Sequence, residues 1–584
     1  FTANIKTVRG LQSGWCTWNA VGNYGLNLSN GNLDWNGGTT NRYCRPTIFV
    51  NSGKWYCEFT MRSTSHIPGI IRDDHPDASG VLGELGSSRF QNDGTIGYSG
   101  ANPVTGGLTW TTGDTVQLYM DMDNKAIYWG VNGILKVGRD GNQGVPTSGS
   151  LKTGAVIYGG MSGFTDRISS NSWGPAAGTN GTDTSVYSST NFGQKPFKFP
   201  PPAGFQPLTL ANTPRPTIVR PDQYVGIVTY SGSGAARSIT TGFQPDFVWF
   251  KGRNNTTNHQ FVDSVRGTSA YLSSDLTNAE ATNTTALTAF TPSGFNLGDN
   301  SNTSQRVNYA ALGDTYVAWC WKAGGNSNTY NINDVGYATA SAAGLTSGTI
   351  TPTGASVNTK SGFSIITYTG TRSASGTDTI SHGLGKAPAL IISKARSASS
   401  RWCVQVPGVI GGTNILQLNT TGAATVGDLG SQTIPTPTTT TFGTAYVGGL
   451  NENGVTYVAY LWAEIPGFSK FGSYTGNGST DGPFVYTGFR PKFIITKVYA
   501  GDTGYWIMCD TARSAYNVAA PSLFANTSGD ETGSTYGNAY DILSNGFKLR
   551  TSSGGLNLST ASFLYIAFAE APSINLYGAQ ANAR

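Results

Sequence analysis

The chain has 584 residues, a formal net charge of +5 and only 12% charged residues. A chain of this length is expected to fold as several domains. Because lysine and arginine form no dense cluster that could follow a phosphate backbone, nucleic-acid binding is not expected. Membrane insertion is not expected either, since no apolar run approaches the roughly 18 residues that a membrane span requires.

Glycine is abundant, at 78 residues, but 13 Trp, 28 Tyr and 26 Phe argue against a disordered chain. Short apolar runs joined by Gly, Asn and Thr turns predict an all-β multidomain protein. The six cysteines form no C-x-x-C pair, and Cys320 and Cys509 lie near apolar runs, so we expect buried free thiols. The four histidines are scattered, and no metal or cofactor is predicted. No secretory signal peptide is visible, and whether a segment precedes Phe1 stays open.

The first 210 residues contain several short strand patterns. Residues 54–60 and 95–98 are predicted strands. The strongest pattern is residues 113–133, in which apolar residues alternate on both sides of a turn at Asp123 and Asn124. Asn132-Gly133 predicts a second turn, of type I′.

These strands, with the segments NFGQKPF (191–197) and PPAGF (201–205), resemble the SPRY domain over about residues 13–210. The resemblance implies a concanavalin-like β-sandwich in residues 1–210. It also implies a binding or spacer module rather than an enzyme, with its partner surface on variable loops. Insertions at about residues 62–92 and 138–185 depart from the family pattern.

The first insertion supplies the binding candidates because it is long and gathers polar side chains: Asp73, Asp74, His75 and Asp77. A metal site there is an alternative, but the ligand spacing is irregular and a polar surface loop is the simpler interpretation. The Asn and Gly turns of the last module are a second choice for receptor contact.

Two other groups of carboxylates were weighed. Asp121 and Asp123 provide oxygen ligands of the kind that Ca²⁺ prefers, although a hairpin turn with solvated carboxylates is favoured. Glu58 and Glu84 are a formal pair for glycoside hydrolysis, but nothing in the sequence places them across a cleft.

The rest of the chain contains an internal repeat. Residues 211–222 form a Pro-rich linker, followed by modules 1 (223–325), 2 (361–466) and 3 (467–572), with a Ser/Thr/Gly-rich linker at 326–360 and a tail at 573–584. Each module opens with Tyr-x-Gly, at 230–232, 368–370 and 474–476. The closing runs align as 316–319, 457–460 and 565–568. We expect β-sandwich-type modules, with modules 2 and 3 in contact and module 1 more separate.

Two further features of the modules favour structural roles. Five tryptophans lie inside apolar runs and are expected in the core rather than on a sugar-stacking platform: Trp249, Trp319, Trp402, Trp462 and Trp506. Asp-x-x-Arg recurs at 263–266 and 510–513. It is interpreted as an exposed local ion pair of small energetic value rather than an active site.

The modules resemble a repeat found in virion structural and tail-fibre proteins of tailed marine phages, through phrases such as GFSIITYTG (362–370), HGLGKAPALIISK (382–394) and DILSNGFKLR (541–550). That family supplies no catalytic motif to transfer. The resemblance implies an extracellular virion protein, most simply a tail fibre or tail appendage that binds host-surface glycans beside other virion proteins. A homo-oligomer, preferably a trimer, is expected. The alternatives are a capsid-decorating or neck or baseplate protein without receptor role, and a tail-associated polysaccharide depolymerase.

Overall fold

The computed structural model describes residues 14–37, 42–73, 75, 82, 87–98, 104–105, 109–123, 126–136, 172–181, 183–213, 216–299, 306–310, 313–424, 429, 432–520, 523–531 and 536–572. This part of the chain is almost entirely strand and turn, which confirms the prediction of an all-β multidomain protein. None of its helices is long and apolar enough to cross a membrane. The backbone divides into two compact units, one up to residue 215 and one formed by most of the chain from residue 216.

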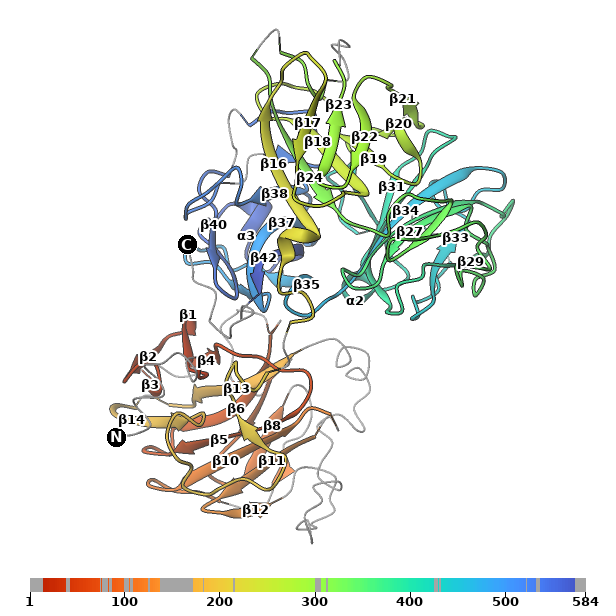
Figure 1. Ribbon diagram of the computed structural model, residues 1–584. Helices are drawn as coiled ribbons and strands as arrows, with labels where there is room; N and C mark the ends of the chain where they lie inside the picture. Colours follow the sequence, from red (N-terminus) through yellow and green to blue (C-terminus); the bar gives the residue numbers. More distant parts are fainter. Residues whose placement is uncertain are drawn as a thin grey trace. The chain divides into compact units, whose positions relative to one another are not determined.

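Unit 1 consists of two sheets (Figure 1). The first has the order β1 (Trp18–Tyr24), β4 (Arg42–Pro46), β13 (Trp173–Thr179), β6 (His66–Arg72), β7 (Ser87–Phe90), β8 (Thr95–Tyr98), β9 (Val104–Thr105). The second has the order β12 (Ile134–Lys136), β11 (Ala126–Val131), β10 (Thr115–Asp121), β5 (Lys54–Thr60), β14 (Asp183–Asn191), β3 (Asp34–Gly37), β2 (Leu26–Ser29), with β15 (Gln206–Pro207) beside β5.

Aromatic side chains from both sheets of unit 1 share one core. Trp18 of β1 stacks on Phe59 of β5 with ring centroids 6.2 Å apart, and Phe90 of β7 stacks on Trp129 of β11 at 5.3 Å. All four side chains are buried. The two sheets therefore face each other as a β-sandwich.

The strand predictions in unit 1 and the turn at Asn132-Gly133 are confirmed, whereas Asn124 of the other predicted turn lies outside the described residues. β10 and β11 pair antiparallel, with Val116 opposite Val131. Asn132 and Gly133 have φ values of 52° and 83°, and a type I′ turn requires positive φ at both of its central residues. The expected strands at 54–60 and 95–98 are β5 and β8.

The insertion predicted at residues 62–92 is not a surface loop throughout. It contains β6 and β7, and every residue of β6 is buried because that strand lies inside the first sheet, between β13 and β7. The sequence His-Ile-Pro-Gly-Ile-Ile-Arg concealed this strand, since Pro and Gly are usually depleted from central strands.

In unit 2, each of the three modules contributes one main sheet. In module 1 the order is β16 (Val225–Ser231), β24 (Thr315–Trp321), β18 (Phe247–Gly252), β19 (Gln260–Asp263), β20 (Gly267–Leu272), β21 (Ala281–Thr282). In module 2 it is β28 (Phe363–Thr369), β34 (Thr456–Ala463), β30 (Pro388–Ala395), β31 (Trp402–Gln405), β32 (Leu416–Gln417). In module 3 it is β35 (Ser469–Thr475), β42 (Ser562–Pro572), β37 (Phe489–Ala500), β38 (Ile507–Asp510), β39 (Leu523–Phe524). The opening strand always pairs with the closing strand, which pairs in turn with the second strand.

A small sheet accompanies each main sheet. These are β17 (Arg237–Thr240), β23 (Gly294–Leu297) and β22 (Leu287–Thr291) in module 1; β29 (Thr377–Ser381) and β33 (Thr441–Ala445) in module 2; β36 (Phe484–Tyr486), β41 (Gly546–Leu549) and β40 (Tyr540–Leu543) in module 3. The helical turns are η2 (Pro221–Gln223), α2 (Pro407–Ile410) and α3 (Gly554–Asn557). In module 1, Phe295 of the small sheet packs on Phe250 of the main sheet, with ring centroids 5.4 Å apart, so the two sheets share a core.

The linker predicted at residues 326–360 is instead part of module 2. It forms β25 (Tyr330–Ile332), β26 (Val335–Tyr337) and β27 (Gly354–Asn358), and β27 pairs antiparallel with β28. Its polar composition suggested a flexible spacer, but alternate residues such as Ala355 and Val357 are fully buried against the module 2 core. The expected separation of modules 1 and 2 is therefore wrong.

The Tyr-x-Gly phrase has the same structural role in all three modules. Its tyrosine hydroxyl donates to the backbone carbonyl just before a buried asparagine, over 2.7 Å in each case: Tyr230 to Val307, Tyr368 to Leu450, Tyr474 to Leu556. That asparagine accepts from the backbone N–H just after the glycine: Asn308 from Ser233, Asn451 from Thr371, Asn557 from Asn477. The phrase thus fastens the opening strand to the segment that precedes the closing strand.

Strand register corrects the alignment of module 3. Tyr230 lies opposite Tyr316 and Tyr368 opposite Tyr457, but Tyr474 lies opposite Phe563 rather than Tyr565. The three ring pairs stack with centroids 5.4, 5.1 and 5.0 Å apart. The matching closing run of module 3 therefore begins two residues earlier than the letters suggest.

Both faces of each main sheet are buried, which explains the nearly unbroken apolar runs. In β24, Ala318 and Cys320 face the module's own core, whereas Trp319 and Trp321 face the other modules. Trp321, Trp462 and Phe568 occupy matching positions and meet edge to face, with centroids 5.6 to 6.4 Å apart. The predicted core positions of the five module tryptophans are confirmed, since none is more than 4% exposed.

Gly476→Ala is expected to destabilise unit 2 by about 2 kcal/mol or more, because a Cβ atom there would lie 2.1 Å from the Leu558 carbonyl oxygen. Gly408→Ala is the matched control, since a Cβ at Gly408 meets nothing within 4 Å. Chemical denaturation of both variants measures the difference. Equal stability of the two variants would contradict the assigned packing.

Candidate functional site: the contacts between the three modules

The predicted binding candidates of unit 1 are only partly described. Asp74 and Asp77 lie outside the described residues. Asp73 and His75 are each 6% exposed, not exposed on a loop as predicted. The guanidinium of the buried Arg45 donates to the backbone carbonyls of both residues, which holds this segment against the first sheet. Ligand binding by these residues stays a prediction.

The other carboxylates weighed in unit 1 have internal partners. Asp121 pairs with Lys54 at 2.9 Å, and Asp123 accepts from the Gly53 N–H at 2.7 Å. Glu58 accepts from the hydroxyl of Tyr56 and from two backbone N–H groups at 198–199. Glu84 lies outside the described residues. No group of three or more metal-ligating side chains occurs in the part of the chain that the structure describes.

Unit 2 holds three buried lysines at matching positions of the second strand: Lys251 in β18, Lys394 in β30 and Lys497 in β37. Each lysine is paired across the sheet with a residue of the closing strand: Val317, Val458 and Leu564 respectively. That residue comes directly after the aromatic ring that stacks on the tyrosine of Tyr-x-Gly. No lysine of the three is more than 1% exposed. Burial lowers the pKa of each to about 8.

Each lysine donates to a backbone carbonyl of a different module. Lys394 of module 2 binds Thr277 of module 1 at 3.1 Å. Lys497 of module 3 binds Thr421 of module 2 at 2.9 Å, and Lys251 of module 1 binds Ser528 of module 3 at 3.1 Å. The three contacts run in one direction, from module 2 to 1, from 3 to 2 and from 1 to 3, and so close a ring. We call the contact of modules 1 and 2 interface A, that of modules 2 and 3 interface B, and that of modules 3 and 1 interface C.

A second set of contacts repeats around the ring. The residue opposite each lysine donates a ring N–H to the fifth strand of the neighbouring module's main sheet (β20, β32 or β39) or to the residue after it. Trp402 donates to Ser273 at 2.8 Å in interface A, and Trp506 donates to Gln417 at 2.9 Å in interface B. In interface C a histidine takes the tryptophan's place, and His259 contacts the Phe524 carbonyl at 3.0 Å. Each acceptor lies four residues before the carbonyl that the lysine binds.

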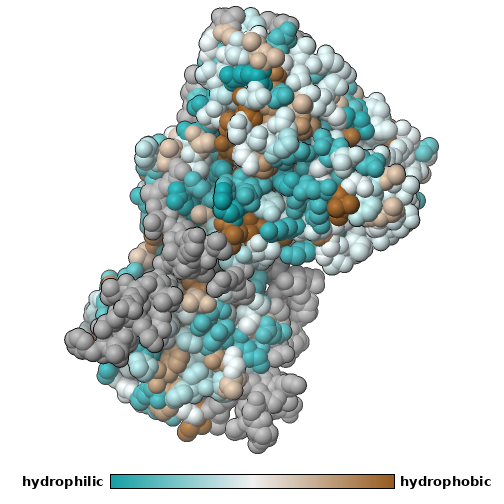
Figure 2. Space-filling view, viewed as in Figure 1, coloured by the Kyte–Doolittle hydropathy of each residue, from teal (hydrophilic) through white to brown (hydrophobic). Residues whose placement is uncertain are grey.

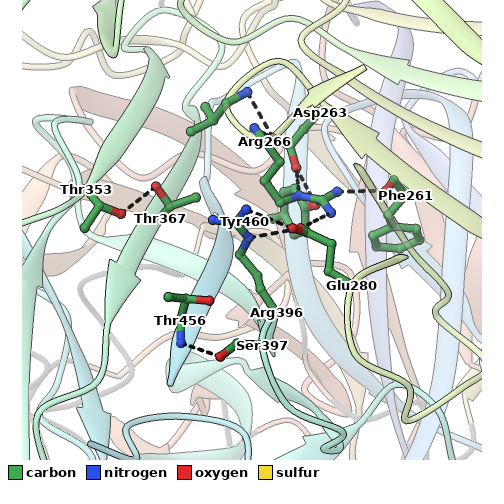
Figure 3. Close-up of polar contacts among 11 residues, drawn as sticks. Phe261, Asp263, Arg266, Glu280, Thr353, Thr367, Arg396, Ser397, Thr456 and Tyr460 are labelled. Carbon is green, nitrogen blue, oxygen red and sulfur yellow. Dashed lines mark hydrogen bonds and ion pairs between the residues drawn. The ribbon is translucent and has the colours of Figure 1, made fainter. Parts of the chain in front are cut away.

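Interface A contains a buried cluster of charged residues (Figure 3). The Arg266 guanidinium contacts Asp263 at 2.5 Å and Glu280 at 2.9 Å, and Arg396 of module 2 makes two bonds of 2.9 Å to Glu280. The Tyr460 hydroxyl of module 2 donates to Asp263 at 2.8 Å. Burial raises the pKa of Glu280, but the two guanidiniums outweigh burial and the net pKa is lowered. The cluster therefore keeps Glu280 ionised and joins the two modules.

Interface C contains the same cluster, built from matching residues. Arg513 contacts Asp510 at 2.6 Å and Glu531 at 3.0 Å. Arg253 of module 1 contacts Glu531 at 2.9 Å, and the Trp319 indole N–H donates to Asp510 at 3.0 Å. The Arg513 guanidinium also lies over the Trp319 ring, 5.3 Å from its centroid.

Interface B has uncharged residues at the matching positions. When the strand pairing of module 2 is continued by one residue, Val406 lies at the position that Asp263 has in module 1. Val409, three residues later, takes the position of Arg266. Ala424 and Tyr499 take the places of Glu280 and Arg396 and keep the backbone hydrogen bond between those positions, at 3.0 Å. Ile566 replaces Tyr460. All members of the cluster were exchanged together, so no buried charge is left without its partner.

The Asp-x-x-Arg interpretation is therefore half right. Both pairs are local, but they are buried rather than exposed: Asp263, Arg266 and Asp510 are 0% exposed and Arg513 is 4% exposed. No local pattern points to the two glutamates or to Arg396 and Arg253, because these residues lie far along the chain or in another module. A lysine that recurs six residues after the proline of each module, at 245, 388 and 491, was the available signal for the ring.

The chemistry of these contacts is that of attachment between modules. A lysine with a lowered pKa is a common mark of a catalytic amine. Here each ammonium is enclosed and donates to two or more backbone or hydroxyl oxygens. The six cysteines are all free and buried, which confirms the prediction for Cys320 and Cys509, and burial raises the pKa of both thiols.

Glu280→Ala is expected to cost about 3 kcal/mol, because it leaves the fully buried Arg266 with one carboxylate fewer. Replacing the whole cluster by the interface B residues (Asp263→Val, Arg266→Val, Glu280→Ala, Arg396→Tyr and Tyr460→Ile) is expected to cost far less. Denaturation of unit 2 measures both.

The exposed Arg220–Asp222 pair provides the control for this experiment. Its side chains are 63% and 51% exposed, so Arg220→Ala is expected to leave stability almost unchanged. A single Glu280 variant as mild as Arg220→Ala would contradict the role of the cluster.

The three buried lysines are expected to add stability to unit 2 between pH 8 and 9.5. They have a pKa of about 8 in the folded chain and about 10.4 when unfolded. At these sites the unfolded chain binds more protons in this window, so each lysine adds on the order of 1 kcal/mol to the free energy of unfolding. The buried thiols Cys320 and Cys509, whose pKa burial raises, contribute in the opposite direction, and variants of a single lysine separate the two effects. Lys394→Met should reduce this gain in stability, whereas Lys386→Met, at an exposed site in the same module, should not.

Comparison with known proteins gives one family and a number of solved structures, two of which are described below. The family model described as Domain of unknown function (DUF7483) matches residues 220–572. The SPRY domain of human HERC1 shares 14% identity, with 30% of this chain and 96% of that chain covered and a TM-score of 0.23. The PSpry domain of TRIM65 shares 12% identity, with 32% and 98% covered and a TM-score of 0.20. No curated protein matches the sequence. The matched family segment runs from η2 to the end of β42 and so includes all three modules and all three interfaces: the chain belongs to the DUF7483 family.

Proposed function

We propose that the protein is a structural component of a bacteriophage particle, a tail fibre or tail-associated appendage that attaches to glycans on the host surface. The phrases that resemble phage virion repeats support this proposal. They lie in the strands and turns that build the three modules, such as β28, β30 and β40–β41. The SPRY resemblance of unit 1 adds a second binding or spacer module.

One observation supports the structural part of the proposal. The buried lysines, carboxylates and guanidiniums at the module contacts all bind groups of another module. The three lysines with lowered pKa and both carboxylate–guanidinium clusters connect modules in a closed ring. Such a ring is a rigid support on which surface loops keep fixed positions. We therefore propose a role in architecture and binding, without catalysis.

The surface of unit 2 suits contact with glycans. Figure 2 shows that its visible face is largely hydrophilic, with small scattered apolar areas. Hydroxyl and amide groups form adaptable, water-mediated hydrogen bonds with sugars. Weak sites of this kind gain strength when several copies bind together. We accordingly keep the proposal of a homo-oligomer, with a trimer of whole chains preferred, outside the cell and beside other virion proteins.

Two alternatives predict different outcomes in the same assays. A capsid-decorating, neck or baseplate protein would be located on the particle but would not bind host cells. A polysaccharide depolymerase would release reducing sugar ends from host polysaccharide. Neither has a specific observation in its favour among the described residues.

The test is binding of the labelled full chain to host-type cells. We expect saturable binding that purified host polysaccharide blocks, with no release of reducing ends. A truncation that ends near residue 466 is unsuitable as a probe, because it removes the Ser528 carbonyl that Lys251 binds and opens interfaces B and C. Absence of binding by the folded chain would overturn the attachment proposal, and immunogold labelling of particles would then decide the architectural alternative.

A further inference from the structure

Interface C differs from the other two at the residue whose ring N–H donates to a backbone carbonyl of the neighbouring module. Interfaces A and B use Trp402 and Trp506, whose indole N–H groups have no charge to gain near neutral pH. Interface C uses His259, which is 0% exposed. Histidine is the side chain whose unperturbed pKa lies near 6.5.

Two hydrogen bonds define the tautomer of His259. The Trp249 indole N–H donates to Nδ1 at 2.7 Å, so Nδ1 carries no proton. Nε2 must then carry the proton and donate to the Phe524 carbonyl of module 3, at 3.0 Å. A second proton on Nδ1 would set two donors against each other. Protonation therefore breaks the bond to Trp249 and disturbs the orientation that reaches Phe524.

The charges around His259 oppose its protonation. Burial first, and then the charge of Lys251, lowers its pKa well below the ordinary value, and Arg513 of module 3 adds to the effect. Lys251 in turn is influenced by the carboxylates of Asp275, Asp530 and Glu531. Asp275 also accepts from the His259 backbone N–H at 3.1 Å.

Asp275 has a pH response of the opposite sign. Burial raises its pKa to about 6, so its protonation favours the folded chain as the pH falls. Asp275 makes this contribution both in the unchanged chain and in a variant that differs only at His259. Comparing the two therefore measures the pH response of His259 alone.

Interface C is also the contact that no direct chain connection supports. The chain passes directly from β24 of module 1 into β25 of module 2, and residues 464–468 connect modules 2 and 3. Modules 3 and 1 are held together by side-chain and backbone contacts alone. A loss of contact here can open the ring without unfolding a module.

We propose that His259 makes interface C sensitive to acid, so that the ring opens between modules 3 and 1 while interfaces A and B stay closed. The sign follows from the lowered pKa: the closed ring favours neutral His259, and the open ring binds an additional proton below about pH 6.5. The equilibrium constant for closure then falls by up to tenfold for each pH unit below that value.

Three matching backbone hydrogen bonds serve as reporters, one in each interface. Glu280 N–H donates to Arg396 in interface A, Ala424 N–H to Tyr499 in interface B, and Glu531 N–H to Arg253 in interface C, at 2.8, 3.0 and 2.7 Å. Hydrogen exchange of the full chain, followed by mass spectrometry and corrected for the intrinsic rate at each pH, measures all three in one sample.

Between pH 7 and pH 5 we expect protection at Glu531 to fall, by up to tenfold for each unit below 6.5, while protection at Glu280 and Ala424 changes little. His259→Gln keeps a neutral donor for the Phe524 carbonyl and should abolish this selective loss. His259→Trp, which copies interfaces A and B, should do the same. The control is His382→Gln, because His382 is buried in module 2 and its ring contacts Thr438 of that module.

The proposal fails if, in the unsubstituted chain between pH 7 and pH 5, the Glu531 N–H loses no more protection than the N–H groups of Glu280 and Ala424. It fails equally if both His259 variants fold, as judged by unchanged protection at Glu280 and Ala424, and still show the selective loss. Persistence of the loss in His382→Gln is the expected result, and its disappearance there would assign the pH response to a different histidine.

Discussion

The whole of unit 2 depends on one constraint, which is that each main sheet buries both of its faces. One face covers the module's own small sheet and the other meets the neighbouring modules around Trp321, Trp462 and Phe568. A single module would leave the second face, with its large aromatic side chains, exposed to water. The modules therefore fold as one compact unit, although the sequence divides them clearly.

When the second face is buried, backbone carbonyls of the neighbouring module are buried with it. These carbonyls then need hydrogen-bond donors from the protein. The chain supplies the same lysine in each module, and each ammonium donates to a carbonyl of a neighbour. The lysines and the indole or imidazole groups beside them thus set the direction in which the modules follow one another. Interfaces A and C add a charged cluster, whereas interface B makes the lysine and indole contacts without one.

The repeat made the fold class predictable. Tyr-x-Gly marks the opening strand because each module uses both of its recurring letters. The tyrosine hydroxyl donates to a backbone carbonyl, as Tyr368 does to Leu450, and the glycine leaves room for a second carbonyl, as Gly370 does for that of Glu452. Its partner asparagines, such as Asn451, were missed since a single Asn in a variable segment has no pattern around it. The segment 326–360 was misjudged for a related reason, because its few apolar residues are hidden among polar ones.

The sequence by itself determined that the chain is built of β-strands, which tryptophans of the modules are buried, that Asn132-Gly133 forms a turn and where the opening Tyr-x-Gly strand of each module lies. These properties depend on neighbours a few residues apart. Only the tertiary structure decided that the modules close into a ring and that Asp263 and Arg266 meet Glu280 and Arg396. It also decided that Asp73 and His75 are buried. Contacts of this kind join residues from different strands and modules, so their geometry exists only after the sheets have packed.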